Sequence, residues 1–184
     1  MSQAREIEVK YRVADLGQVE AALHQRSLSL SRPVHQDDQA YAEIDWQYGM
    51  GKLGRSFVRL RTQDGHHVFT LKRPDANELA CHEYETAVAD REQMHAAILA
   101  IGLLPTTRIM KTRRTARHGD LSLCLDDVEH IGAFFEIEKV IGPEESGEAV
   151  QAELDAFARS LGVELERTAD TYDSLVRAAH MAAV

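Results

Sequence analysis

The segment Glu6-Ile7-Glu8-Val9-Lys10-Tyr11-Arg12 alternates charged and apolar residues without interruption. A β-strand directs alternate side chains to opposite faces, so two carboxylates followed by two bases would share one face. Paired carboxylates can bind a hard divalent cation, and adjacent bases can bind an anion that the cation also contacts. The segment therefore suggests a site for a metal-bound polyphosphate, although an antiparallel strand with one solvated face alternates in the same way.

Several later segments repeat this two-residue alternation. The repetition helps to decide between a ligand site and an ordinary strand with one solvated face. The residues that share a face are Arg59 with Arg61, Thr70 with Lys72, Glu83 with Glu85, Lys111 with Arg113, Ser122 with Cys124 and Asp126, and Glu136 with Glu138. Like charges that face each other across strands would destabilise an ordinary surface sheet. The pattern instead indicates charged faces arranged around a ligand. If the sheet closes into a barrel, these faces can line its interior and hold a triphosphate with its cations.

Turn and capping signals divide the chain into the elements that must position these residues. We expect strands at residues 6–13, 36–44, 57–62, 67–73, 81–88, 108–115, 121–128 and 133–141. We expect helices that begin near Asp15 and Asp90 and helices over 148–161 and 171–181. Asp64-Gly65 predicts a hairpin turn, 46–55 a flexible glycine-rich loop and 74–79 a connection. Strands grouped in hairpins favour an antiparallel sheet or barrel, so we predict one α+β domain over residues 1–184.

Composition excludes several classes of function. The 184 residues include 21 Lys and Arg against 30 Asp and Glu, a net charge of −9, which argues against general nucleic-acid or anionic-membrane binding. Cys81 and Cys124 fit neither a disulfide framework nor a zinc spacing and are expected to be buried thiols. The start of the chain lacks a signal peptide, and no stretch could span a bilayer, so a soluble cytoplasmic protein is expected.

Taken together, the motifs resemble those of the CYTH superfamily, also called triphosphate tunnel metalloenzymes. The opening motif is Glu6-x-Glu8-x-Lys10, and the later ones, in the same order as in the family, are Arg59-Leu60-Arg61, Leu71-Lys72-Arg73-Pro74, Glu83-Tyr84-Glu85, Lys111-Thr112-Arg113 and the run from Leu125 to Glu138. The opening motif alone is weak, whereas the ordered set is specific. The resemblance implies a closed eight-stranded antiparallel barrel that binds a triphosphate in a tunnel with Mg²⁺ or Mn²⁺.

The resemblance also implies a role for each matching position. The residues implied in metal binding are Glu6, Glu8, Asp126, Glu136 and Glu138. The residues implied in phosphate binding are Lys10, Arg59, Arg61, Lys72 and Arg113. Lys111, together with Tyr41, is placed like residues that orient an attacking water in hydrolytic members. Glu83 and Glu85 complete the acidic side, either by binding a second metal or by holding the bases in place.

The motifs leave the reaction open. The chain is most similar to the class IV adenylyl cyclases, in which ATP yields cyclic AMP and pyrophosphate. The alternative is a triphosphatase that hydrolyses inorganic triphosphate, thiamine triphosphate or a nucleoside triphosphate. A more remote alternative is a non-catalytic polyphosphate- or nucleotide-binding module, and the retained carboxylates argue against it. A homodimer is suggested only by resemblance to relatives.

Overall fold

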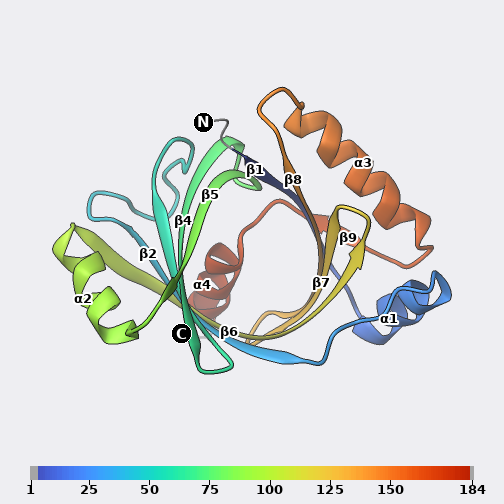
Figure 1. The fold of residues 1–184 in the computed structure, drawn as a ribbon, viewed down its shortest axis with the longest axis horizontal. Helices are drawn as coiled ribbons and strands as arrows, with labels where there is room; N and C mark the ends of the chain where they lie inside the picture. Colours follow the sequence, from blue (N-terminus) through green and yellow to red (C-terminus); the bar gives the residue numbers. More distant parts are fainter. Residues whose placement is uncertain (1–3, 183–184) are drawn as a thin grey trace.

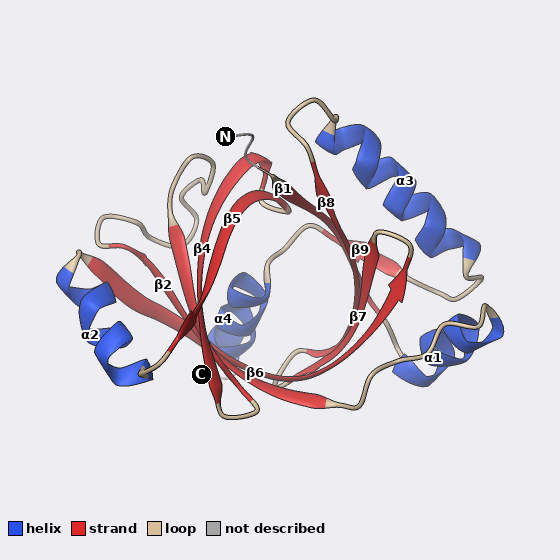
Figure 2. Cartoon of the chain, in the orientation of Figure 1, coloured by secondary structure: helices blue, strands red, loops and turns tan. Residues whose placement is uncertain are grey.

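The computed structural model describes residues 4–182, and its strands close into an antiparallel barrel (Figures 1 and 2). The strands are β1 (Arg5–Arg12), β2 (Val34–Glu43), β3 (Phe57–Gln63), β4 (His66–Asn77), β5 (Ala80–Val88), β6 (Leu103–His118), β7 (Leu121–Val128), β8 (Gly132–Ile141) and β9 (Glu166–Thr168). Their order is β5-β4-β3-β2-β6-β7-β8-β1-β9, and a further pairing of β5 with β1 closes a ring of eight strands. The predicted α+β class and eight-stranded barrel are confirmed.

Local sequence signals account for the boundaries of several elements. Asp64 and Gly65 both have positive φ, 50° and 75°, and join β3 to β4 in the tight turn that Asp-Gly favours. Asp15 accepts a hydrogen bond from the Gly17 amide at the start of α1 (Leu16–Gln25), and Asp90 accepts from two amides at the start of α2 (Arg91–Ala100). Both helices therefore begin at the capping residues that the sequence indicates.

The apolar faces of the strands point outward and pack against helices. One cluster joins β1, β7 and β8 to α1 and to α3 (Gly147–Ser160), with Leu23 and Leu154 buried at its centre. A second cluster joins β2 and β3 to α2, with Leu60 and Ile98 buried. The helices α1, α2 and α3 lie outside the ring in Figure 1, beside these strands. The main apolar core is thus external to the barrel, which leaves the interior for polar side chains.

One end of the interior is closed by α4 (Tyr172–Ala182). Ile109 and Phe134 lie on the same strand faces as the charged residues of β6 and β8, and they pack against Tyr172 and Val176 of α4. Figure 1 shows α4 within the outline of the ring, behind the strands nearest the viewer. The interior face therefore changes from charged to apolar at this end, and α4 covers it.

Two expected boundaries differ clearly from the structure, and one short strand was not expected. β6 has 16 residues and begins at Leu103, five residues before the prediction, and β4 continues to Asn77 through Pro74, where a connection was expected. The pairing of β4 with β5 is irregular between Pro74 and Asn77, which is how a strand accommodates a residue without an amide hydrogen. The three-residue strand β9 was not predicted. Within residues 4–182, no helix is long and apolar enough to cross a bilayer.

Candidate active site

The barrel interior contains a cavity of about 430 Å³ whose walls are mostly charged. Side chains from β1 through β8 contribute to it, because each strand directs its polar face inward. The predicted site residues that line it are Glu6, Glu8, Lys10, Tyr41, Arg59, Arg61, Lys72, Glu83, Glu85, Lys111, Arg113, Glu136 and Glu138. The structure therefore brings together residues that are up to 132 positions apart in the sequence.

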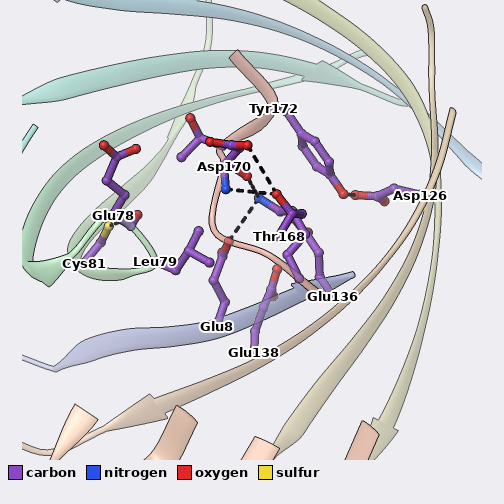
Figure 3. A network of polar contacts seen from close by, with 12 residues as sticks. Glu8, Glu78, Leu79, Cys81, Asp126, Glu136, Glu138, Thr168, Asp170 and Tyr172 are labelled. Atoms are coloured by element: carbon purple, nitrogen blue, oxygen red, sulfur yellow. Dashed lines mark hydrogen bonds and ion pairs between the residues drawn. The ribbon is translucent and has the colours of Figure 1, made fainter. Parts of the chain in front are cut away.

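Three carboxylates converge on one wall of the cavity. Oxygens of Glu6, Glu8 and Glu138 all lie within 4.8 Å of one another. Glu8 and Glu138 are direct register partners on β1 and β8, and Figure 3 shows them side by side. Burial is the main cause that raises the pKa of Glu6 to about 8; Lys72 opposes the rise, and the neighbouring carboxylates Glu138 and Glu83 add to it. Burial likewise raises the pKa of Glu8, so each of these two carboxylates would be stabilised in its charged form by a cation.

Lys10 lies beside this acidic cluster, which is defined here as Glu6, Glu8 and Glu138. Its Nζ atom is 3.3 Å from Glu8 Oε1 and 3.2 Å from Glu136 Oε1, and the side chain is buried. Burial alone would raise the pKa of Glu136, but Lys10 and Arg113 together lower it to about 2. Glu136 is therefore a charged partner of bases in this structure, and its role in metal binding stays a prediction. The three carboxylates of the acidic cluster lie close enough together to hold one metal ion.

Asp126 is the centre of a buried network of donors. Its carboxylate accepts two hydrogen bonds from Arg113, at 2.7 and 2.5 Å, and one from Lys111 Nζ at 3.0 Å. The Tyr172 hydroxyl donates a fourth, at 2.9 Å (Figure 3). Burial opposes ionisation, but Arg113 and Lys111 hold the pKa of Asp126 below its usual range. Burial, reinforced by Arg113, lowers the pKa of Lys111.

The part of the wall formed by β3 to β5, which continues from β1 through the β5–β1 pairing, also presents bases that are paired with acids. Lys72 forms an ion pair with Glu83 and lies 3.6 Å from Glu6. Arg59 contacts Glu85 at 3.4 Å, and its buried Nε has no hydrogen-bond partner among the described residues. Glu83 and Glu85 thus contact bases, and the choice between the two implied roles, binding a second metal or holding the bases in place, stays a prediction. An unpartnered guanidinium nitrogen in the wall favours an anionic ligand.

Tyr41 is placed differently from the other predicted residues. Its ring borders the cavity, but its hydroxyl lies 2.7 Å from Nδ1 of His95 on α2. The side chain is buried in the apolar cluster between the sheet and α2. Lys111 therefore lines the cavity, whereas the Tyr41 hydroxyl contacts His95, which belongs to a helix outside the barrel.

Three residues of the site were missed at the sequence level. Asp38 of β2 accepts two hydrogen bonds of 2.7 Å from Arg61, and a two-residue period applied to β2 would have placed it on the inner face. Lys52, from the loop 44–56, is 7% exposed and binds Glu78, Thr171 and Ser174. Tyr172 has no periodic signal, because it begins a helix after a short irregular segment.

Comparisons with known proteins agree with this geometry. A family model described as the CYTH domain matches residues 4–172. A curated protein of Methanocaldococcus jannaschii, named "Putative adenylate cyclase MJ0240", is 25% identical over 160 residues, which cover 86% of this chain and 90% of that protein.

Solved structures share the fold. The PH1819 protein of Pyrococcus horikoshii superimposes with a TM-score of 0.78 at 21% identity, covering 94% of this chain and 98% of that one. A Hippeastrum protein, described as a "Putative adenylyl cyclase" with a dominant triphosphatase activity, gives a TM-score of 0.62 at 19% identity and covers 97% of this chain and 96% of its own. At these identities the structural likeness establishes the fold alone.

Proposed function

Because the chain belongs to the CYTH domain family, we propose that it is a divalent-metal-dependent enzyme that cleaves a triphosphate inside its barrel. The observation on which the proposal rests is the convergence of Glu6, Glu8 and Glu138 to within 4.8 Å in a cavity whose other walls present arginines and lysines. Metal ligands and phosphate ligands thus border one enclosed space. Phosphoryl chemistry requires both, because catalysis consists largely of positioning and charge stabilisation.

The acidic cluster fits Mg²⁺ or Mn²⁺. Both ions prefer carboxylate oxygens, and the cluster offers three such groups at mutual distances that one ion can bridge. When bound, the ion would neutralise charge on the phosphate oxygens as the reaction proceeds. Glu6, Glu8 and Glu138 would hold it, while Asp126 and Glu136 would position the bases that they already contact.

The bases would bind the triphosphate by exchanging their partners. Lys72 and Arg59 are paired with Glu83 and Glu85, which are 16% and 56% exposed, so phosphate oxygens can replace or join these carboxylates. Arg59 also has its free Nε to donate. Lys10 of β1 and Arg113 of β6 also line the cavity and add further donors. The chain would thereby hold the phosphates in line between the metal and the guanidinium groups.

We propose conversion of ATP to cyclic AMP and pyrophosphate as the first candidate reaction. The ribose 3′ hydroxyl would lose its proton to water as its oxygen forms a bond to the α-phosphorus, the bond from that phosphorus to the bridging oxygen would break, and pyrophosphate would leave. Lys111 would orient the attacking oxygen with its N–H groups. The cavity volume of about 430 Å³ lies within the roughly 300–1,000 Å³ common for small-molecule sites, and the name of the Methanocaldococcus relative supports this candidate.

Hydrolysis of a terminal phosphate is the second candidate, favoured by the triphosphatase activity of the Hippeastrum protein. The same residues serve this reaction, with water as the attacking oxygen at Lys111. The triphosphate could then be tripolyphosphate, thiamine triphosphate or a nucleoside triphosphate.

A direct assay separates the candidates. The protein is incubated with ATP, thiamine triphosphate or tripolyphosphate, with Mg²⁺ or Mn²⁺, and the products are resolved by ion-exchange chromatography. Cyclic AMP with equimolar pyrophosphate is expected for the cyclase, whereas phosphate without a cyclic product overturns it in favour of hydrolysis. Glu6→Gln plus Glu8→Gln should reduce turnover by at least about 100-fold, and Glu153→Gln, on the exposed face of α3, is the matched control. Unchanged turnover in the double variant would contradict the metal assignment.

A further inference from the structure

Tyr172 brings the chain segment after β9 into contact with the interior of the barrel. The connection from β9 passes Lys10, whose Nζ donates to the Asp170 carbonyl at 3.4 Å, and Tyr172 then begins α4. Its side chain is 8% exposed and packs edge-on against the Phe134 ring, with centroids 5.0 Å apart. The ring borders the cavity, so its position is fixed from one side by the apolar end of the barrel.

The Tyr172 hydroxyl shares an acceptor with Lys111. Both donate to Oδ2 of Asp126, at 2.9 Å from the hydroxyl and 3.0 Å from the ammonium nitrogen. Asp126 is fully buried. Since buried hydrogen bonds to a carboxylate are directional and strong, the hydroxyl limits the positions that the carboxylate can adopt. It thereby limits the position of Lys111.

The Tyr172 ring also contacts two ammonium groups. Lys111 Nζ lies 4.7 Å from the ring centroid and Lys10 Nζ lies 4.4 Å from it, within the range of cation–π attraction. Within residues 4–182, Asp126 is the one hydrogen-bond acceptor of Lys111 Nζ. An ammonium group has three N–H donors. The carboxylate occupies one of them and the ring covers one side of the group, so the remaining donors are directed toward the cavity.

We propose that Tyr172 is a positioning residue that fixes the Lys111 ammonium group for its contact with the attacking oxygen. This inference rests on the proposed function, because it assigns Lys111 the contact with the reacting atoms. Tyr172 itself acts through Lys111, by its hydroxyl through Asp126 and by its ring directly. The role explains why a tyrosine, and not an aliphatic residue, fills the position where α4 enters the barrel.

A double-mutant cycle tests the proposal. Tyr172→Phe should lower kcat about tenfold with less than about a twofold change in KM, because it removes one hydrogen bond to a charged group and keeps the ring. Tyr172→Leu should lower kcat further. In a Lys111→Met background, Tyr172→Phe should have at most about a twofold effect, because the residue through which it acts is absent. Effects of the two substitutions that multiply would overturn the proposal.

A control separates positioning from the docking of α4. Val176→Ala removes buried apolar contact from the same helix and should lower the melting temperature while kcat stays within about twofold. A loss of kcat equal to that of Tyr172→Phe would show that general docking suffices, which would also overturn the proposal.

A separate measurement distinguishes failure of the proposed function from failure of the proposed role of Tyr172. If the wild-type protein turns over none of the three triphosphates, the enzyme proposal fails, and the same cycle is measured as affinity for tripolyphosphate with Mn²⁺ by calorimetry. Non-additive effects of Tyr172→Phe and Lys111→Met on that affinity would support positioning of Lys111 toward the bound anion. Additive effects, or an affinity that neither substitution changes, would reject it.

Discussion

Glu8 of β1 and Glu138 of β8 are direct register partners, so two carboxylates face each other across adjacent antiparallel strands. Like charges in this arrangement destabilise a sheet. Two bases partly balance these charges, because Arg113 lies 3.4 Å from Glu138 and Lys10 lies 3.3 Å from Glu8. Glu6, however, adds a third carboxylate to the same cluster. The structure thus concentrates negative charge at a place where a divalent cation would relieve the repulsion.

The first prediction is that a divalent metal stabilises the fold through this cluster. Mn²⁺ or Mg²⁺ should raise the melting temperature relative to EDTA, with a gain of about 2.7 kcal/mol when the free metal is 100 times its Kd. Glu138→Gln should lose most of this gain and should be at least as stable as the wild type in EDTA, because it removes repulsion. Differential scanning fluorimetry in both conditions checks this. Glu153→Gln should behave like the wild type, and a metal-induced shift that persists in Glu138→Gln would reject the site.

The second prediction concerns the ion pair of Asp38 and Arg61 and its dependence on pH. Burial opposes ionisation, but the hydrogen bonds and charge of Arg61 hold the pKa of Asp38 below its usual range. A carboxylate with a lowered pKa contributes stability above its unfolded pKa, about 3.9, and loses that contribution as pH falls through its folded pKa. Asp38→Asn should therefore cost about 2 kcal/mol of unfolding free energy near neutral pH, and the difference from the wild type should shrink below about pH 4.

Urea denaturation of both proteins between about pH 7 and pH 2.5 measures this difference. Asp64→Asn is the matched control, because Asp64 pairs with Arg32 at the surface, where ion pairs contribute little. A difference between Asp38→Asn and wild type that is constant over the whole range would show that the charge of Asp38 does not contribute.

The two-residue period explains why much of the site could be predicted from the sequence. Lys111 and Arg113, or Glu136 and Glu138, must share a face once their segments are strands, and the clash of like charges on neighbouring strands excludes an ordinary surface. The closure of the barrel, unlike the shared faces of single strands, could not be predicted from local periodicity. It depends on the pairing of β1 with β5, between residues more than 70 positions apart, and no local pattern encodes that contact.

Residues outside the strands could not be assigned in this way. Lys52 lies in a glycine-rich loop that has no periodicity, and its burial results from contacts with Glu78 and with the start of α4. Tyr172 enters the site only because α4 folds back over the end of the barrel. Both positions depend on long-range packing, which sequence patterns within a short window do not contain.

The third prediction decides the role of Tyr41. The resemblance implies that it helps to orient an attacking water, whereas the structure places its hydroxyl 2.7 Å from His95 Nδ1. Tyr41→Phe should therefore leave kcat within about twofold and lower the unfolding free energy by about 1 kcal/mol. His95→Ala should lower stability similarly, and the two effects should not add, since they remove one hydrogen bond. A loss of kcat of about 100-fold with unchanged stability would restore the catalytic role.

The fourth prediction is that Lys52 fastens the loop 44–56 to the rest of the barrel end. Its Nζ contacts Glu78 at 3.0 Å, Thr171 at 2.7 Å and Ser174 at 3.1 Å. One side chain thus joins the loop to the turn between β4 and β5 and to the start of α4. Lys52→Met keeps most of the apolar stem but leaves Glu78 and Asp173 without their shared cation. We expect a loss of about 1–3 kcal/mol in unfolding free energy and faster proteolytic cleavage within the loop, because its opening no longer breaks these contacts.

Limited proteolysis followed by mass spectrometry locates the cleavage caused by Lys52→Met. Arg55→Met is the control, because Arg55 belongs to the same loop but pairs with Glu43 and Asp45 at its base and does not reach α4. Lys52→Arg should preserve protection in part, since its charge can still meet Glu78 although its planar head cannot reproduce the same contacts. Equal cleavage of wild type and Lys52→Met would show that the aromatic packing of Trp46 on Phe57, with ring centroids 5.1 Å apart, is sufficient to hold the loop.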